Sequence, residues 1–195
     1  EDFQKYSGKK ISKISLSDQK LEDLIEEVNI HKSEYLYLAS NETIEGIQLK
    51  NFNNFNKKLI IDMSSDICSY KFDWKNVSFL YAGAQKNLGI PGVTICILRN
   101  DFIEEANLTS YLNAKNHISK NSAFNTPPTF SIYVMLNILN WINTNGGLKQ
   151  IEESNVAKAN KIYRFIDQNL EKLIPLAPKQ LRSASNIVFD FKEKN

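Results

Sequence analysis

The sequence contains little cysteine and lacks a long apolar run. Its two cysteines, Cys68 and Cys96, are too few for a disulfide framework, and their spacing fits no common zinc-binding pattern. No apolar run approaches the roughly 20 residues that a membrane-spanning helix requires. The N-terminal residues have neither the basic start nor the apolar core of a signal peptide. We therefore expect reduced thiols, no membrane partner and a cytoplasmic location.

An excess of charge of one sign is also missing. The 195 residues include 24 Lys and Arg against 22 Asp and Glu, for a formal net charge of +2. Proteins that bind nucleic acid usually carry a clustered basic surplus, so no nucleic-acid partner is expected. The remaining composition, 42% hydrophobic and 24% charged, is typical of a globular protein that is long enough to bury a core.

Short apolar runs that end in polar residues indicate the strands of an α/β fold. The buried-strand candidates are residues 35–38, 59–61, 77–81 and 93–98. Such runs predict a covered, largely parallel sheet, whose ligands bind beyond the carboxyl ends of the strands. The first two runs end in polar residues, at Ser40 and at Asp62, so we expect the functional site at that edge.

Helical spacing of apolar residues appears before and after these strands. Residues 17–29 predict a helix with Ser17 as its cap, and residues 130–141 predict a largely buried helix after a Pro-stiffened turn. Two glycines break that helix, and a longer one is expected over 148–173. A new strand is expected to begin at residues 186–191.

Lys86 lies in a segment whose residue types suit a ligand site. Residues 81–89 read Tyr-Ala-Gly-Ala-Gln-Lys-Asn-Leu-Gly, so a strand leads into small residues, a lysine and a glycine turn. Small residues leave room for a flat ligand, whose surroundings would desolvate the lysine and favour its nucleophilic neutral amine. A phosphate-binding lysine is an alternative, although the Walker pattern is absent. A solvated lysine is the commoner case.

Asp62 ends an apolar strand, where an unpaired carboxylate is costly to bury. One interpretation is a cap for the following turn, through Ser64 and Ser65. The other is a counter-ion for a cationic group of a ligand. Taken alone Asp62 favours the cap, whereas together with Lys86 it favours the ligand.

Five segments of the chain occur in the order and at the approximate spacings of one enzyme family. They read Asn-Glu-Thr-Ile-Glu-Gly at 41–46, Asp-Met-Ser-Ser at 62–65, the lysine segment at 81–89, Asn-Thr-Pro-Pro-Thr-Phe at 125–130 and Trp-Ile-Asn-Thr-Asn-Gly-Gly at 141–147. Together they resemble the phosphoserine aminotransferase family of class V, fold-type I pyridoxal-phosphate enzymes. The resemblance covers nearly the whole chain.

The resemblance implies roles for individual residues. Lys86 matches the lysine that holds pyridoxal 5'-phosphate as a Schiff base, and Asp62 matches the carboxylate at the pyridine nitrogen. Thr43 matches a cofactor-binding threonine near the ring hydroxyl, and Gln85 matches a glutamine that contacts the phosphate. Catalysis is therefore expected to depend on Lys86 and Asp62.

Asn125 and Thr126 match a pair that reaches the cofactor phosphate of the neighbouring subunit, so the resemblance implies a homodimer with shared sites. Backbone amides at a helix start attract anions, which suits that role. Taken from the residues alone, simple helix capping is the preferred alternative.

The implied reaction converts 3-phosphohydroxypyruvate and L-glutamate into O-phospho-L-serine and 2-oxoglutarate, a transamination of serine biosynthesis. The implied architecture is α/β, with residues 1–155 as the C-terminal half of the cofactor-binding large domain. Residues 156–195 are then a connecting helix and the start of a small C-terminal domain.

Some features of the family have no match in this chain. None of its arginines, Arg99, Arg164 and Arg182, matches a substrate-binding position, and the histidines, His31 and His117, are expected to be solvated. One alternative is thus a catalytically incomplete fragment or paralogue that acts as a dimerising interaction module. Another is a different class V enzyme, although neither cysteine suits a desulfurase.

Overall fold

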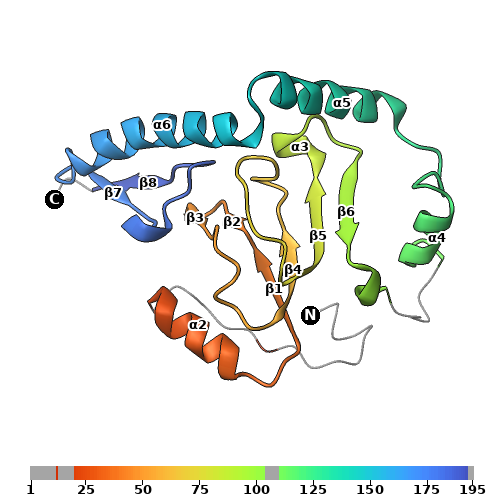
Figure 1. Ribbon diagram of the computed structural model, residues 1–195. Helices are drawn as coiled ribbons and strands as arrows, with labels where there is room; N and C mark the ends of the chain where they lie inside the picture. The colour runs from red at the N-terminus through yellow and green to blue at the C-terminus, as the bar shows by residue number, and fades with distance from the viewer. Residues whose placement is uncertain (1–11, 13–19, 104–109, 193–195) are drawn as a thin grey trace.

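A four-stranded sheet forms the centre of the molecule (Figure 1). The computed structural model describes residues 12, 20–103 and 110–192. Strand order is β1-β4-β5-β6; the first three strands run parallel, and the last is antiparallel to its neighbour. The strands are β1 (Tyr35–Ala39), β4 (Lys58–Asp62), β5 (Val77–Gly83) and β6 (Thr94–Leu98). The largely parallel α/β sheet predicted from the sequence is therefore present.

The two central strands carry most of the core. Leu59, Ile61, Leu80 and Ala82 are all 0% exposed, and the register places Ile61 beside Leu80. Side chains alternate across a strand, so the intervening residues, such as Phe79, face the other side and are half-buried. The apolar side chains of the buried face stabilise the sheet by about 25 cal/mol for each Å² that they remove from water.

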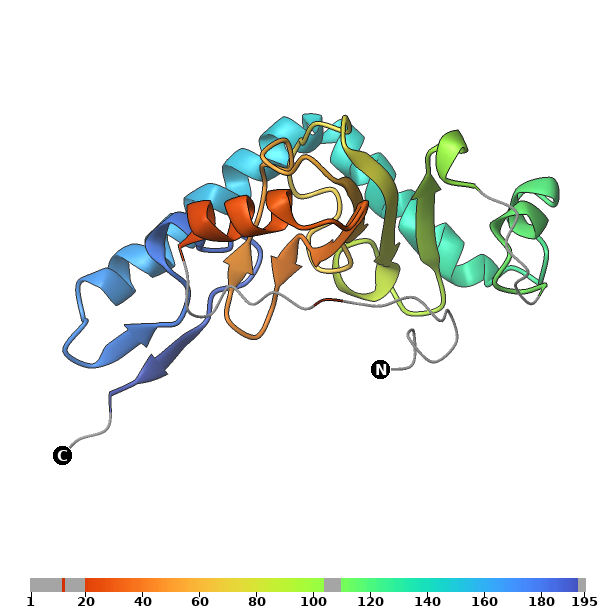
Figure 2. The ribbon, with the colours of Figure 1, turned by 90° about the horizontal axis from the view of Figure 1, so that it is seen from below.

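Three main helices pack against this core (Figures 1 and 2). Leu24 and Val28 of the first helix are buried in it, as is Ile142 near the end of the second. Gly146 and Gly147, with φ of +87° and +70°, turn the second helix into the third. The helices and short helical turns are α2 (Leu21–Ile30), α3 (Ala84–Asn87), η1 (Asn100–Phe102), α4 (Ala114–Ser119), α5 (Thr129–Thr144) and α6 (Gly147–Asp167). None of the helices in the described part of the chain is long and apolar enough to cross a membrane.

The C-terminal residues form a smaller unit along α6. Tyr163 and Ile166 of α6 bury their side chains against Leu173. A second small cluster joins Ile47 to Ala177 and Leu181, so this unit also contacts the β2–β3 hairpin that follows β1. The remaining elements are β2 (Asn41–Glu42), β3 (Ile47–Gln48), β7 (Leu173–Pro175), η2 (Lys179–Leu181) and β8 (Phe189–Phe191).

Two expectations about burial were wrong. The helix over 130–141 was expected to be largely buried, yet only Ser131 and Ile142 of α5 are buried, and Phe130 and Trp141 are 70% and 56% exposed. The sequence showed that the helix is apolar but not that the described residues cover only one of its sides. Residues 93–98 form a strand, but β6 is an edge strand and none of its residues is buried.

Two expectations about helix ends also need correction. The helix expected to reach residue 173 ends at Asp167, and Leu173 belongs to β7, because pairing with β8 takes it out of the helical path. The first helix begins at Leu21 with Lys20 as its N-cap residue, whereas Ser17 lies outside the described residues.

Candidate active site

A polar pocket opens where β1 and β4 end, at the edge of the sheet that the sequence indicated. Its volume is about 180 Å³. Parallel strands end at the same edge, so segments far apart in the chain contribute to one wall. The pocket brings together three of the predicted site residues, Thr43, Asp62 and Lys86. The complete lining is Ala39, Asn41, Glu42, Thr43, Asp62, Ser64, Ser65 and Lys86.

Asp62 is the last residue of β4 and is half-buried. Its Oδ1 accepts a hydrogen bond from the backbone N–H of Ser64 at 2.8 Å, so it does cap the turn. The same carboxylate lines the pocket. The two interpretations of Asp62 therefore do not exclude each other, because a carboxylate has acceptor capacity beyond one bond.

Tyr81 is a neighbour of Asp62 that sequence reasoning did not single out. The β4–β5 register pairs the two residues, and the Tyr81 hydroxyl lies 2.9 Å from the Tyr37 hydroxyl. Burial raises the pKa of the Tyr81 phenol above its usual range, and Tyr37 and Asp62 raise that pKa further. Tyr81 therefore stays protonated beside the carboxylate. Only the register between two strands, which local sequence does not show, could have identified it.

Lys86 extends from α3, a single turn that is anchored on both sides. Ala84 and Leu88 are fully buried, and the Ala84 N–H donates to the carbonyl oxygen of Val93 at 2.9 Å. The side chain of Asn87 donates to the carbonyl oxygen of Ile67. Lys86 itself is exposed at the pocket.

Gln85 is exposed and is not part of the pocket lining. Its side chain lies against Gly83, where an added Cβ would come within 2.5 Å of the Gln85 Oε1. The small residue at position 83 therefore leaves room for the Gln85 side chain next to the end of β5.

Asn125 and Thr126 are exposed and lie outside the pocket of their own chain. The following helix, α5, begins at Thr129, and its N-cap residue Pro128 makes no side-chain cap bond. The capping role preferred from the residues alone is therefore absent at this helix start.

His117 also lies outside the pocket. The sequence placed it in a solvated loop, whereas the structure places it on α4, partly buried. Its Nε2 donates to the carbonyl oxygen of Tyr111 at 2.7 Å, and its ring lies edge-on to Phe124. These contacts give His117 a structural role in folding the segment before α5.

Other pocket residues hold the hairpin loop in place. The Glu42 carboxylate accepts from the N–H groups of Ile44 and Glu45 at 3.0 and 2.8 Å, which fixes the loop that carries Thr43. The Ser65 hydroxyl donates to the carbonyl oxygen of Asn41 at 2.8 Å. Neither Asn41 nor Glu42 was predicted as a site residue, although both belong to the 41–46 segment.

Comparisons with known proteins extend this description. The sequence profile of the class V aminotransferases (Aminotransferase class-V) matches residues 1–195. A phosphoserine aminotransferase of Geobacillus kaustophilus is 45% identical over 157 residues, which are 80% of this chain and 44% of that protein. The chain thus spans less than half the length of this curated relative.

Two solved structures give the same result. The phosphoserine aminotransferase of Bacillus circulans subsp. alkalophilus superposes with a TM-score of 0.81 at 41% identity, covering 87% of this chain and 48% of that one. The pyridoxal-phosphate-bound phosphoserine aminotransferase of Trichomonas vaginalis has a TM-score of 0.76 at 35% identity, covering 80% and 47%.

The chain belongs to the class V aminotransferase family. Its α/β fold, a fold-type I aminotransferase architecture, is confirmed by these neighbours. Three curated relatives that are 40–49% identical are named phosphoserine aminotransferase, so the comparisons do not favour a silent interaction module.

Proposed function

We propose that the full-length protein is a pyridoxal-phosphate-dependent aminotransferase. Its reaction interconverts 3-phosphohydroxypyruvate and L-glutamate with O-phospho-L-serine and 2-oxoglutarate. The observation that carries this proposal is the pocket in which Thr43, Asp62 and Lys86 meet. Relatives named phosphoserine aminotransferase support the choice of substrates.

The chemistry of the pocket fits the cofactor. Its residues offer a carboxylate for a protonated ring nitrogen, a primary amine for an aldehyde, and the hydroxyls of Thr43, Ser64 and Ser65 for oxygen atoms of the ligand. Asp62 and Lys86 come from different strand ends, so a flat ring has a partner at each of two positions. Bound pyridoxal phosphate supplies an electron sink for negative charge at the substrate α-carbon.

In this proposal each residue has a defined task. Asp62 keeps the proton on the ring nitrogen, because its negative charge stabilises the neighbouring positive one. Tyr81 lies beside Asp62 in the strand register, and its hydroxyl shares a hydrogen bond with that of Tyr37. With the cofactor bound, Lys86 would hold it; as a free amine, Lys86 would then accept the proton from the substrate α-carbon and return it to the aldehyde carbon of the cofactor, a general acid–base task. Its exposed position lets a substrate amine reach it.

We also propose a homodimer with shared sites. Asn125 and Thr126 are exposed beyond their own pocket, in front of an uncharged helix whose outer face is apolar. Exposed apolar faces of this kind are typical of protein interfaces. In the dimer these two residues contact the cofactor phosphate of the partner subunit, and Gln85 contacts the phosphate within its own chain.

The domain division stays a proposal as well: residues 1–155 form the cofactor-binding part, and residues 156–195 form the connecting helix and the start of a small domain. The boundary falls inside the continuous helix α6, so the connection is stiff.

The two cysteines, Cys68 and Cys96, are free thiols, which supports a reducing, cytoplasmic setting.

A comparison of amino acceptors tests the proposed function. With glutamate as donor, kcat/KM for 3-phosphohydroxypyruvate should exceed that for glyoxylate by at least about 100-fold, because a site built to bind a polar group rejects an analogue without it. Steady-state assays of 2-oxoglutarate production measure both. A preference for glyoxylate would place the protein elsewhere in class V.

A further inference from the structure

The hairpin wall of the pocket rests on a segment from the far end of the chain. Residues 182–186, here called the backing segment, contact the β2–β3 hairpin through hydrogen bonds and through the bridge between Ile47 and Arg182. No residue of the backing segment lines the pocket itself. Its contacts nevertheless reach Asn41 and Thr43, which do.

Ser183 is the most buried residue of the backing segment, with 0% exposure. Its hydroxyl donates to Asn41 Oδ1 at 2.5 Å and accepts from the backbone N–H groups of Ser185 and Asn186 at 3.0 and 3.1 Å. Its backbone N–H donates to the carbonyl oxygen of Gly46 at 2.9 Å. Ser183 is thus bonded to the first strand of the hairpin and to the loop before the second strand.

Asn186 completes the contact with the pocket wall. Its Oδ1 accepts from Asn41 Nδ2 at 2.7 Å, and its own Nδ2 donates to the carbonyl oxygen of Thr43 at 3.2 Å. Asn41 is 4% exposed, and its Nδ2 also donates to the hydroxyl of Ser65 at 2.9 Å. The Asn41 amide therefore has partners for both its oxygen and its nitrogen, and buried amides need such partners.

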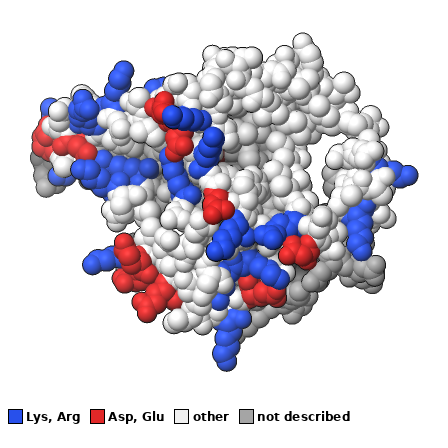
Figure 3. Space-filling view, viewed as in Figure 1, with Lys and Arg blue, Asp and Glu red and all other residues white. Residues whose placement is uncertain are grey.

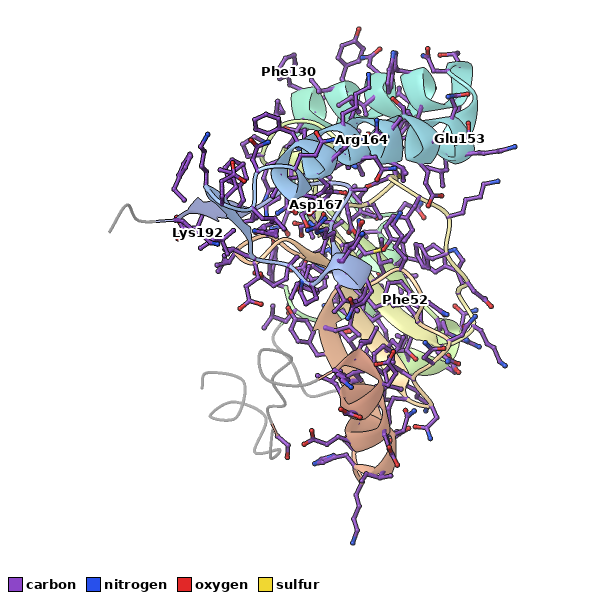
Figure 4. All side chains as sticks on the ribbon, turned by 90° about the vertical axis from the view of Figure 1, so that its left-hand side faces the viewer. Phe52, Phe130, Glu153, Arg164, Asp167 and Lys192 are labelled. Carbon is purple, nitrogen blue, oxygen red and sulfur yellow. The ribbon has the colours of Figure 1, made fainter. Side chains whose placement is uncertain are left out.

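The other side of the backing segment is tied to α6. Arg182 makes a two-bond ion pair with Asp167, at 2.8 and 2.7 Å, and its guanidinium lies 4.7 Å from the centre of the Tyr163 ring. The Tyr163 hydroxyl donates to the carbonyl oxygen of Ser183 at 3.0 Å. Figure 4 shows Asp167 on the side of α6 that faces the C-terminal segment. A continuous set of contacts therefore joins α6 to the pocket wall.

We propose that Ser183 and Asn186 are positioning residues for the cofactor pocket: they orient Asn41, Thr43 and Ser65 without touching the ligand. This inference rests on the proposed function, because it assigns the oriented wall to pyridoxal phosphate. Binding free energies are reciprocal, so a wall that binds the cofactor better when the backing segment is docked makes the cofactor hold that segment in place.

Cofactor titration of the full-length protein tests this role. The dissociation constant of pyridoxal phosphate, measured by absorbance of the Lys86 adduct, should rise about tenfold in Asn186→Ala, the scale of one or two lost hydrogen bonds. Asn186→Asp keeps the acceptor for Asn41 but turns a carboxylate oxygen toward the Thr43 carbonyl oxygen, so the dissociation constant should rise at least as much. Ser183→Ala serves if Asn186→Ala does not fold. The dissociation constant of Ser183→Ala should rise by a similar factor.

The matched controls are Asn54→Ala and Ser119→Ala, both exposed and outside the pocket lining. They should bind pyridoxal phosphate with the wild-type dissociation constant. A second readout is limited trypsin digestion after Lys179 and Arg182, which precede Ser183. Saturating pyridoxal phosphate should slow these cleavages in the wild type, and the protection should be lost in Asn186→Ala.

The outcomes separate this inference from the proposed function. Asn186→Ala and Asn186→Asp with lowered melting temperatures but unchanged dissociation constants would show a merely structural role and overturn the inference alone. Absence of any Lys86 adduct in the wild-type protein would overturn the proposed function and this inference with it.

Discussion

The pocket wall and the segment before α5 present their polar side chains in opposite ways. In the wall, Asn41 and Ser65 are hydrogen-bonded to each other, and Asn41 is also bonded to residues far along the chain. In the segment before α5, Asn125 and Thr126 are exposed and make no side-chain hydrogen bond within the described residues. Contacts within the chain therefore fix the side chains of the pocket wall. The described residues provide no such contacts for the side chains of Asn125 and Thr126.

The helix that follows this segment shares its exposure. Phe130 points outward from the start of α5 (Figure 4), and the surface over this helix carries no Lys, Arg, Asp or Glu (Figure 3). Monomeric proteins rarely expose a large apolar surface that carries no charged residue. In the site as we propose it, one half is preorganised by its own chain and the other half depends on the proposed partner subunit, and the following predictions test each half.

Lys86→Ala should have the largest effect, since it removes both the proposed attachment point of the cofactor and the proposed base. Borohydride reduction and peptide mapping should place the wild-type cofactor adduct on Lys86, and the variant should have none. Turnover should fall by at least about 10³-fold, within the range lost with a general acid–base group. Lys71→Ala, an exposed lysine outside the pocket, is the control. An adduct on another lysine would contradict the assignment.

Asp62→Asn should reduce transamination by about 100-fold, the scale of one strong electrostatic group in a site. The asparagine oxygen still accepts from the Ser64 N–H, so the turn should keep its geometry. Steady-state rates and the melting temperature measure the two properties separately. Near-normal turnover would leave Asp62 with the capping role alone.

Mixing two inactive variants tests the half that requires a partner. Thr126→Asp places a carboxylate where the proposal puts a neighbouring phosphate, and Lys86→Ala removes the lysine. In a heterodimer with shared sites, one site collects both changes and the other collects neither. About one site in two of each heterodimer should therefore be active, which is about a quarter of all sites after an equal mixture is refolded. If heterodimers form and stay inactive, Thr126 acts within its own chain.

The smallest expected effect concerns Asp66, a fully buried carboxyl below the pocket wall. Burial raises its pKa above the ordinary value near 3.8, although hydrogen bonds from Ser40 and Gln48 lower that pKa in part. The folded state therefore holds this proton more tightly than the unfolded state. The stability that results is complete below the unfolded pKa and is lost as pH rises through the folded pKa.

Urea unfolding should be measured from below the ordinary Asp pKa to above the raised pKa of Asp66. As pH rises through this range, the free energy of unfolding of the wild type should fall relative to that of Asp66→Asn. Asp73→Asn is a control with the opposite sign. A hydrogen bond from Asn53 and the Lys75 backbone N–H lower the pKa of Asp73, so its contribution is lost as pH falls. Parallel curves for wild type and Asp66→Asn would contradict the prediction.

Much of the sheet could be predicted from local sequence, because a short apolar run that ends in Asp62 or before Ser40 is a signal within a few residues. The direction of β6 could not, since periodicity is the same in parallel and antiparallel strands. The end of α6 was missed because Leu170 and Leu173 continue the helical spacing, and only pairing with β8 decides against it.

The same limit applies to the site. Asp62 and Lys86 stand out because each sits where a strand gives way to a turn. Ser183 and Asn41 do not, because the hydrogen bond between them joins residues 142 positions apart, and neither residue has a local signal. Tyr81 became a neighbour of Asp62 only through strand register.

The span of that hydrogen bond also orders events during synthesis on the ribosome. Domains fold as the chain emerges, from the N-terminus onward. The pairing of β1, β4 and β5 can form early, because these strands lie within residues 35–83. The hairpin wall cannot settle until residues 183–186 have emerged. Non-local contacts of this kind form slowly. We therefore expect the nascent protein to have a sheet before it has a finished pocket, and to bind the proposed cofactor only after both have formed.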